Sequence, residues 1–226
     1  MKPKELKYPF TWEERRVLIH GRVWYLPACL KEEDSFVFPG FHSPELFGND
    51  HPVFVEYCSG NGAWIAERAR LAPEHNFVAV EKRFDRTQKI WSKIHNHQLE
   101  NLIVVFGEGM AFTKRFLPSD SIEGAFVNFP DPWPKKKHAK HRLIQKSFVD
   151  ELSRILKNEG VITLVTDDPD YSCAMIESFQ HPNFHSLHPE PFYVEDLGQY
   201  GSSYFDALWR EKGKVIRYHQ FENTCT

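Results

Sequence analysis

The fold of this chain is decided by residues 53–69, which read VFVEYCSGNGAWIAERA. An apolar run of strand length comes first, a Ser-Gly-Asn-Gly turn follows at 59–62, and a helix-forming sequence starts at Ala63. Glycine at 60 and 62 lets the backbone turn sharply and approach a ligand closely at the amino end of a helix. A strand, a glycine turn and a helix predict the first part of an alternating α/β fold.

The alternation continues along the chain. Further strands are expected at residues 77–81, 102–106, 122–127 and 161–165, and helices up to about residue 97 and over 142–157. The alternating segment 214–221 predicts a final antiparallel strand. Strands that alternate with helices favour a mostly parallel, doubly wound sheet with right-handed crossovers.

The first 50 residues lack this pattern. Thr11 and Glu14 predict a capping box for a short helix over residues 11–16, and prolines interrupt the remainder. We expect a single domain over residues 1–226, made of an N-terminal arm (1–50) and an α/β domain (51–226). The arm is expected to pack on the domain, which is favoured over the alternative that its arginines and aromatic residues touch a substrate.

The composition is that of an ordinary globular protein. It is 41% hydrophobic and 26% charged, and 28 basic residues against 31 acidic ones give a formal charge of −3. Net charge therefore does not indicate nucleic acid, and that inference must rest on local clustering. No stretch reaches the roughly 18 apolar residues of a membrane span, and no leader is recognised. A cytoplasmic protein that is not attached to a membrane is expected.

The four cysteines, Cys29, Cys58, Cys173 and Cys225, form no CxxC pair and no metal-ligand spacing with histidine. We expect reduced thiols and no metal site. No obligate protein partner is inferred.

Basic residues cluster in the segment 128–142, which reads NFPDPWPKKKHAKHR. Three prolines end the preceding strand and stiffen the loop, which places Asp131 and Trp133 before five cations. Open α/β sheets bind ligands at the carboxyl ends of their strands. This loop therefore predicts a site for a polyanion and a planar group. The alternative is a solvated charged surface.

The first two strands predict a different ligand. Glu81 ends the second strand 25 residues after Glu56, near the spacing at which an acidic residue meets a ribose in nucleotide sites. The absence of a third glycine and of a GxxxxGK[ST] loop disfavours dinucleotides and nucleoside triphosphates. A ligand with a ribose and no phosphate fits, and S-adenosylmethionine adds a cationic group that Glu56 could face. A structural ion pair is the alternative for Glu56.

These motifs resemble the bacterial single-subunit tRNA (guanine-N7)-methyltransferases, from about Val53 to Phe221. The resemblance rests on VEYCSGNG (55–62), AVEKR (79–83), FPDPWPKKKH (129–138), Thr166-Asp167 and SYFD (203–206). The FPDPWPKK stretch is specific to the family, whereas most methyltransferases share the glycine turn. The resemblance implies a Rossmann-like class I methyltransferase fold and methylation of guanine 46 in the tRNA variable loop.

The resemblance also implies site residues. The cofactor S-adenosylmethionine would be bound by Glu56, Gly60, Gly62, Glu81, Glu108 and Asp131. The substrate would be contacted by Lys135, Asp167, Ser203, Tyr204, Phe205 and Asp206. RNA phosphates would be held by Lys136, Lys137, Lys140 and Arg142.

The chain departs from the family pattern at two places. Gly107-Glu108-Gly109 stands where the family has Gly-Asp-Ala or Gly-Asn-Ala, and Ser203 to Asp206 stands where it has Thr-x-Phe-Glu. Both changes keep the chemistry and alter the reach of the side chain.

The reaction needs orientation more than a base. Guanine N7 is an exposed acceptor with a free lone pair, so no proton has to be removed before methylation. Asp131 is the residue expected nearest to the reaction, and Trp133 either stacks on the extruded base or packs within its loop. The alternatives are a methyltransferase of another nucleophile and a non-catalytic RNA-binding domain.

Overall fold

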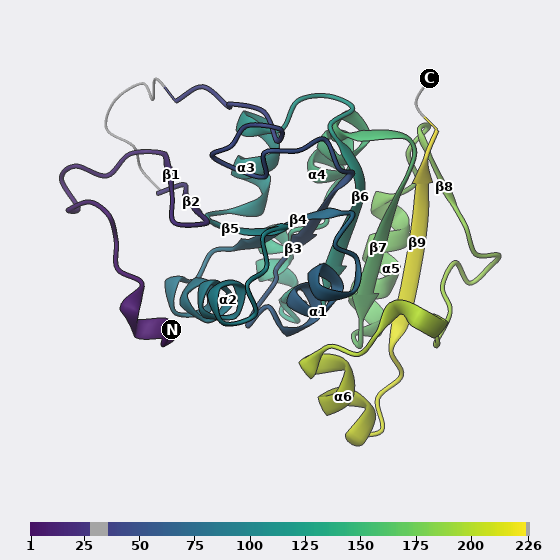
Figure 1. Ribbon diagram of the computed structural model, residues 1–226. Coiled ribbons are helices and arrows are strands. Elements are labelled where there is room, and N and C mark those ends of the chain that lie inside the picture. Colours follow the sequence, from purple (N-terminus) through teal and green to yellow (C-terminus); the bar gives the residue numbers. More distant parts are fainter. Residues whose placement is uncertain (28–35, 225–226) are drawn as a thin grey trace. The chain divides into compact units, whose positions relative to one another are not determined.

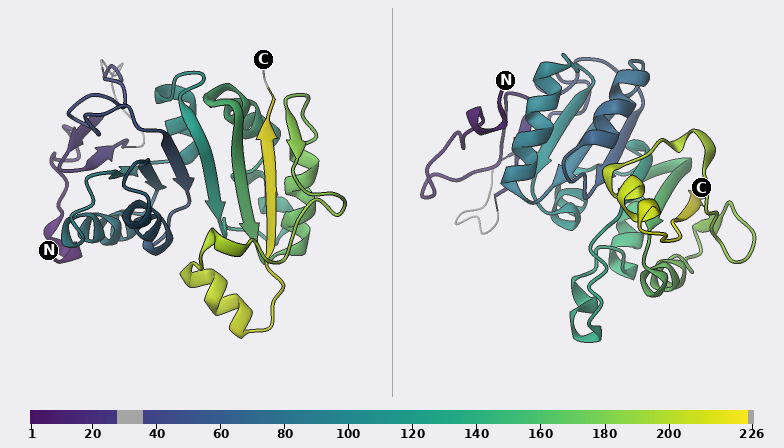
Figure 2. Two further views of the ribbon diagram at one scale, coloured as in Figure 1. Left: turned by 45° about the vertical axis from the view of Figure 1, so that its right-hand side comes forward. Right: turned by 90° about the horizontal axis from the view of Figure 1, so that it is seen from below.

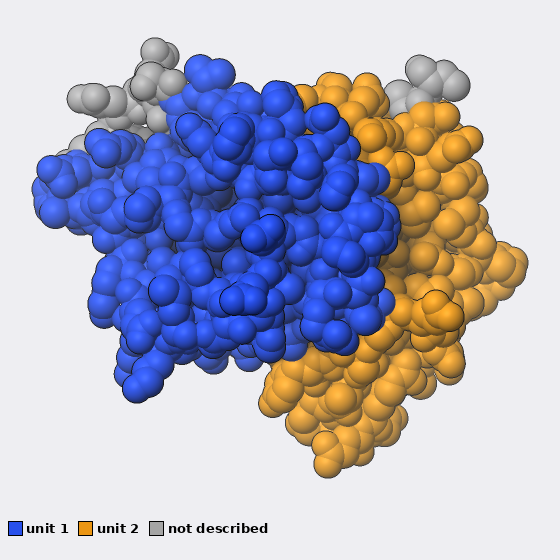
Figure 3. Space-filling view, viewed as in Figure 1, with its two compact units in different colours: residues 1–117 blue, residues 118–226 orange. Residues whose placement is uncertain are grey.

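The computed structural model describes residues 1–27 and 36–224 (Figure 1). The chain divides into two compact units, Met1–Leu117 and Pro118–Thr226 (Figure 3). The expectation of a single domain over residues 1–226 stays a prediction. Of the cysteines, Cys58 and Cys173 are free thiols, while Cys29 and Cys225 lie outside the described residues.

The first unit contains a sheet in the order β1-β2-β5-β4-β3. Its elements are η1 (Pro3–Glu5), β1 (Leu18–His20), β2 (Val23–Tyr25), β3 (Val53–Tyr57), α1 (Ala63–Leu71), β4 (Asn76–Glu81), α2 (Phe84–Asn96), β5 (Leu102–Phe106) and α3 (Gly109–Phe116). Strands β2, β5, β4 and β3 are parallel, and β1 is antiparallel to β2. Helices α1 and α2 cover one face of this sheet and α3 the other (Figure 1). This explains why β3, β4 and β5 are almost continuously apolar, since strands covered on both faces bury every side chain.

The N-terminal arm differs from the expectation. No helix forms over residues 11–16, where Glu14 N–H donates to the Thr11 carbonyl (3.2 Å) in a single turn. The arm instead supplies η1, β1 and β2, and β2 pairs with β5. Such three-residue strands are set by pairing with the sheet and leave little pattern in the sequence.

Two aromatic residues of the arm belong to the core, whereas Tyr8 and Trp12 are exposed. Trp24 and Tyr25 have no exposed surface. The Trp24 ring stacks on Phe38 (5.5 Å between centroids) and meets Phe112 of α3 edge-on (5.3 Å). The guanidinium of Arg22 donates to the Leu46 carbonyl (2.8 Å). These are packing contacts, and packing is the role expected for the arm.

The second unit contains a sheet in the order β6-β7-β9-β8. Its elements are β6 (Ile122–Asn128), η2 (Lys136–His141), α4 (Lys146–Ile155), β7 (Leu156–Thr166), α5 (Pro169–Ser178), β8 (Phe184–Ser186), η3 (Gly198–Tyr200), α6 (Tyr204–Glu211) and β9 (Arg217–Asn223). Strands β6 and β7 are parallel, and β9 is antiparallel to β7 and β8. Helices α4 and α5 pack against β7, whereas η2 and α6 project from this unit (Figure 2). The antiparallel final strand is confirmed, and β8 lies beyond it at the edge.

One predicted helix has the wrong bounds. The apolar stripe over residues 142–157 predicts a single helix, but α4 covers only Lys146–Ile155 and β7 begins at Leu156. Leu156 is a buried apolar residue that pairs with Ile122 across the sheet, so it fits the strand as well as the helical stripe. Glycine at 160 is required because a Cβ there would lie 2.8 Å from the Lys157 carbonyl oxygen.

Across the described parts of the chain, no helix is both long enough and apolar enough to cross a membrane. No group of three or more His, Cys, Asp or Glu side chains within the same residues could hold a metal ion.

Candidate functional site

In the first unit, most of the predicted site residues lie where β3 and β4 end, and Glu108 lies between β5 and α3. The turn between β3 and α1 has positive φ angles at Cys58 (60°), Gly60 (56°) and Gly62 (68°), and Gly62 N–H closes it on the Ser59 carbonyl (2.8 Å). A Cβ at Gly62 would lie 2.6 Å from Ile90 Cγ1 of α2, whereas a Cβ at Gly60 would have no neighbour closer than 3.9 Å. Gly62 is therefore required by packing, and Gly60 leaves its backbone open to close approach.

Glu81 holds this turn in place. Its carboxylate accepts the backbone N–H of Gly60 at Oε2 and that of Arg83 at Oε1, both at 2.9 Å. The residue is 4% exposed, and burial raises the pKa of its carboxyl against the opposing effect of these N–H donors and of Arg86. Strand β4 thus contributes a fixed carboxylate beside the glycine turn.

The other two acidic residues predicted as cofactor contacts in this unit, Glu56 and Glu108, differ from each other. Glu56 lies within β3, 2% exposed, and pairs in register with Ala79 of β4. Glu108 precedes the first residue of α3 and is exposed, and its side chain makes no hydrogen bond that caps the helix. Their roles as cofactor contacts stay predictions.

In the second unit, the loops after β6 and β7 start at the same edge of the sheet. Asn128 of β6 is in register with Val165 of β7, and Phe129 N–H donates to the Val165 carbonyl (2.9 Å). Asp131 therefore follows β6, and Asp167 follows β7, at the carboxyl ends of two parallel strands. This is the part of an α/β sheet at which ligands bind.

The proline-rich loop has a strained backbone. Phe129 and Trp133 both have positive φ angles, 49° and 45°, which bulky residues rarely adopt. The exposed carboxylate of Asp131 accepts the Trp133 N–H at 3.2 Å. Asp131 is thereby accessible and fixed by its own loop.

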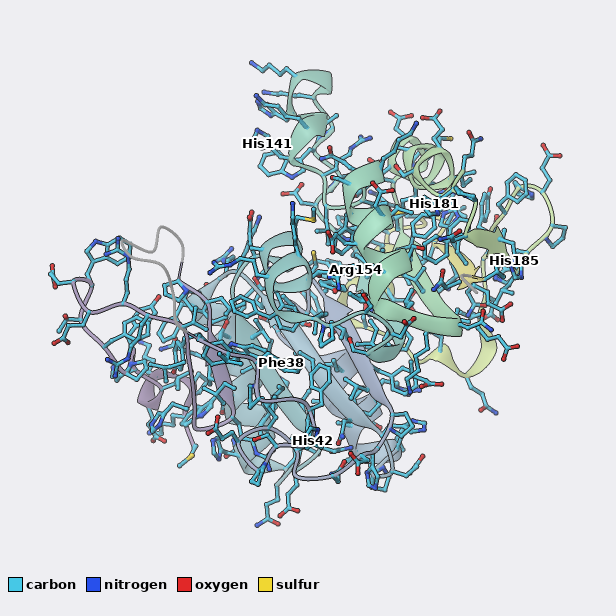
Figure 4. All side chains as sticks on the ribbon, turned by 90° about the horizontal axis from the view of Figure 1, so that it is seen from above. Phe38, His42, His141, Arg154, His181 and His185 are labelled. Atoms are coloured by element: carbon cyan, nitrogen blue, oxygen red, sulfur yellow. The ribbon has the colours of Figure 1, made fainter. Side chains whose placement is uncertain are left out.

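Residues 133–142, which include the basic run, form a projecting segment around η2 that is called the hairpin below. Lys135, Lys137 and Lys140 are exposed along it, and the side chain of Lys136 lies outside the described part of the chain. The half-buried Trp133 ring meets the rings of His138 (5.8 Å) and His141 (5.2 Å), the latter labelled in Figure 4. The indole therefore packs within the hairpin.

Arg142 is at the base of this hairpin. Its Nε donates to the Pro132 carbonyl (2.8 Å), and its guanidinium lies 4.7 Å from the centre of the Tyr171 ring. Arg142 thus closes the loop that contains Asp131. Contact with an RNA phosphate remains a prediction for this residue and for the lysines.

The segment from Ser203 to Asp206 starts helix α6. Ser203 Oγ accepts the Asp206 N–H (3.2 Å), which is a capping interaction. Asp206, 6% exposed, accepts Arg210 Nε (2.8 Å) and the Tyr218 hydroxyl (3.2 Å) at Oδ1 and so attaches α6 to β9. Tyr204 is 62% exposed.

Sequence reasoning missed four residues around this helix. Arg210 and Tyr218 bind Asp206, Lys214 forms a salt bridge with Asp167, and the Trp209 ring lies beneath Lys214. The spacing of Ser203 and Asp206 is that of a capping box, and this signal could have predicted α6 and, through it, Arg210 one turn later.

Comparisons with known proteins identify the family. Residues 50–218 match the model of a family described as "Putative methyltransferase". The tRNA (guanine-N(7)-)-methyltransferase of Chlamydia abortus is 45% identical over 221 residues, which is 98% of this chain and 97% of that protein. The enzyme of the same name from Chlamydia caviae is 43% identical with the same coverage.

Solved structures support the fold. An antibiotic-resistance methyltransferase, Kmr, has a TM-score of 0.54 and 16% identity, covering 78% of this chain and 89% of its own. The precorrin-6y C5,15-methyltransferase of Geobacter metallireducens has a TM-score of 0.52 and 17% identity, covering 78% and 82%. The expected Rossmann-like methyltransferase fold, mostly parallel with an antiparallel strand, is confirmed. The sequence matches place the chain in the family of the tRNA (guanine-N(7)-)-methyltransferases.

Proposed function

We propose that this protein transfers a methyl group from S-adenosylmethionine to N7 of guanine 46 in the variable loop of tRNA, giving 7-methylguanosine. One observation carries the proposal: identity of 43% and 45%, over 98% of the chain, to relatives named tRNA (guanine-N(7)-)-methyltransferase. The acidic side chains at the strand ends and the basic hairpin agree with that chemistry.

The first unit fits the methyl donor. Glu81 accepts the backbone N–H groups of Gly60 and Arg83, and its Oε2 lies 3.8 Å from the Arg86 guanidinium; a carboxylate has about four acceptor positions, so it can also accept a ribose hydroxyl. Glu56 adds a second buried carboxylate, which a cationic ligand would favour. S-adenosylmethionine offers a ribose, an ammonium and a sulfonium without phosphate, and it supplies an electrophilic methyl group when bound. Glu56, Gly60 and Glu81 would hold it, with Glu108 and Asp131 as further contacts.

The second unit offers groups that suit guanine. N7 is unprotonated, and the ring presents N1–H and N2–H₂ donors that a carboxylate can accept. Asp131, Asp167 and Asp206 are the acidic candidates, and Asp206 has one oxygen already bonded to Arg210 and Tyr218. We assign Asp131 the role of orienting the reacting groups, with Lys135 and the segment from Ser203 to Asp206 as further substrate contacts.

The hairpin around η2 suits the RNA backbone. Lys135, Lys137 and Lys140 expose ammonium groups on a short projecting segment, and neutralised phosphates release counterions. The sequence-based phosphate contacts at Lys136 and Arg142 are proposed with them. Trp133, packed between two histidines, is proposed to stiffen the hairpin and not to stack on the target base.

The proposal is tested with unmodified tRNA and a labelled methyl donor. Nuclease digestion should release labelled 7-methylguanosine, and a transcript with adenine in place of guanine 46 should remain unlabelled. Label in another nucleoside would replace the proposed target. Binding of tRNA without any transfer would point to a non-catalytic RNA-binding protein.

A further inference from the structure

The carboxylate of Asp167 has a partner that the sequence did not reveal. Asp167 follows β7, Lys214 precedes β9, and the two strands pair so that Thr166 lies opposite Arg217. The Lys214 ammonium forms a hydrogen-bonded salt bridge with Asp167 Oδ2. The Asp167 side chain is 14% exposed and that of Lys214 is 45% exposed. A carboxylate buried to this degree interacts more strongly with its partner than a surface pair does.

Lys214 is itself held from two other sides. Its ammonium lies 4.1 Å from the centre of the Trp209 ring, a distance at which a cation is attracted to the ring face. Its backbone N–H donates to the Trp209 carbonyl (2.9 Å), and Gly213, at φ +72°, allows the chain to reverse at that point. The lysine is therefore directed at Asp167 by the end of helix α6.

The support extends to the core of the second unit. Trp209 packs on the cluster of Val165, Ile216 and Tyr218, of which Val165 belongs to β7 and Tyr218 to β9. Tyr218 in turn binds Asp206, which fixes α6 on β9. A continuous set of contacts thus joins the strand that precedes Asp167 to the lysine that binds it.

We propose that Lys214, supported by Trp209, is a positioning residue that orients Asp167 toward the N1–H and N2–H₂ edge of the guanine. The inference rests on the proposed function. Lys214 contacts Oδ2, and each carboxylate oxygen has acceptor capacity for more than one donor. A fixed carboxylate discriminates better between bases than a mobile one, because less freedom is lost when the guanine binds.

The test is a double-mutant cycle on transfer to tRNA transcripts. Lys214→Met removes the charge and keeps most of the side-chain stem, and Asp167→Asn removes the anion. Lys214→Met should lower kcat/KM by roughly ten- to a hundredfold, the usual effect of losing one hydrogen bond to a charged group. In the Asp167→Asn background the same change should have almost no further effect, because its target is already gone. Lys214→Arg should recover part of the loss.

Substrate choice provides the second measurement. Inosine lacks the 2-amino group, so a transcript with inosine at the target measures how far that group is recognised. Lys214→Met should reduce the preference for guanine over inosine, and Lys212→Met should not. Lys212 is the matched control because its ammonium also lies over the Trp209 ring, at 4.7 Å, one residue before Gly213. Circular dichroism of each variant checks the fold.

Three results would overturn the assignment. Additive losses in the double mutant would make Lys214 an independent contact, such as one to a phosphate. Equal losses of kcat/KM in Lys212→Met and Lys214→Met would mean that both lysines act only through their positive charge. An unchanged preference for guanine over inosine in Lys214→Met would mean that Lys214 has no part in base recognition. All three presuppose wild-type methylation of guanine, and its absence would instead contradict the proposed function.

Discussion

Glu81 takes part in two kinds of interaction. Its carboxylate fixes the Gly60 and Arg83 N–H groups at 2.9 Å, and it is the proposed acceptor for the ribose of the methyl donor. A substitution at this residue therefore removes both a ligand contact and the support of the turn. The two effects have different signatures, because the second is present without any ligand.

Glu81→Ala should weaken binding of S-adenosylmethionine by roughly 1.5–3 kcal/mol, the loss expected for a hydrogen bond to a charged group. Calorimetric titration measures this. The same variant should also unfold at lower denaturant concentration without ligand, because two backbone N–H groups lose their acceptor. Glu67→Ala, on the exposed face of α1, is a control for both measurements. An unchanged dissociation constant would exclude Glu81 from the binding site.

Asp131→Asn should lose most of the methyl transfer, because the anion that orients the reacting groups is removed. Methyl transfer should not require this residue to accept a proton, since guanine N7 has no proton to give up. Rates against pH for both proteins, under saturating tRNA and methyl donor, check this. An ionisation near neutrality that disappears in the variant would identify Asp131 as a general base. Near-normal turnover would leave orientation to Asp167 and Asp206.

Among the elements, the strength of the local signal decided what the sequence could predict. The apolar runs of β3, β4, β5 and β6 predicted those strands to within a residue or two, because strands covered on both faces must be apolar throughout. Strands β1 and β2 have three residues each; β2 is defined by its pairing with the distant β5, and β1 by its antiparallel pairing with β2. The end of α4 was misplaced since Leu156 suits a helix or a strand equally well.

The residues of the candidate site also divide into those that a local sequence signal predicts and those that it does not. Glu81 and Asp131 were proposed because one ends and the other follows a predicted strand, a position that has meaning in any α/β sheet, whereas Asp167 was proposed from the family resemblance. Lys214, Trp209 and Tyr218 were missed because their role depends on where α6 attaches to β9. No periodicity along the chain reports such a contact between distant residues.

The hairpin around η2 makes the element-scale prediction. Changing Lys137 and Lys140 to glutamate should raise the KM for tRNA and reduce the salt dependence of binding by about one unit of logarithmic slope for each phosphate that is no longer neutralised. Binding measured at several salt concentrations provides the slopes. Lys2 and Lys4 of the N-terminal arm, changed in the same way, keep the net charge equal and serve as the control. Identical slopes in both double variants would mean that the hairpin is only a solvated surface.

At the scale of the whole molecule, a single buried histidine links stability to pH. His219 has no exposed surface; its Nδ1–H donates to the Phe192 carbonyl (2.9 Å) and its Nε2 accepts from Ser172 (3.0 Å). Burial lowers its pKa from 6.5 to about 4, assisted by the charge of Arg217. The folded protein therefore keeps the imidazole neutral at a pH where the unfolded chain already protonates it.

The sign follows from this difference in proton uptake. Above pH 6.5 the histidine is neutral in both states, and the folded state incurs no penalty. As the pH falls from 6.5 to about 4, only the unfolded chain binds the proton, so the free energy of unfolding should decrease by up to about 3 kcal/mol. Denaturant titrations across this range measure the slope. His219→Gln, whatever its stability at pH 7, should lose most of this pH dependence, whereas His185→Gln, at a side chain that is 49% exposed, should retain it. If the two variants had equal slopes, the acid sensitivity would have to come from other groups, and the buried network of Ser172, His219 and Phe192 would have no part in it.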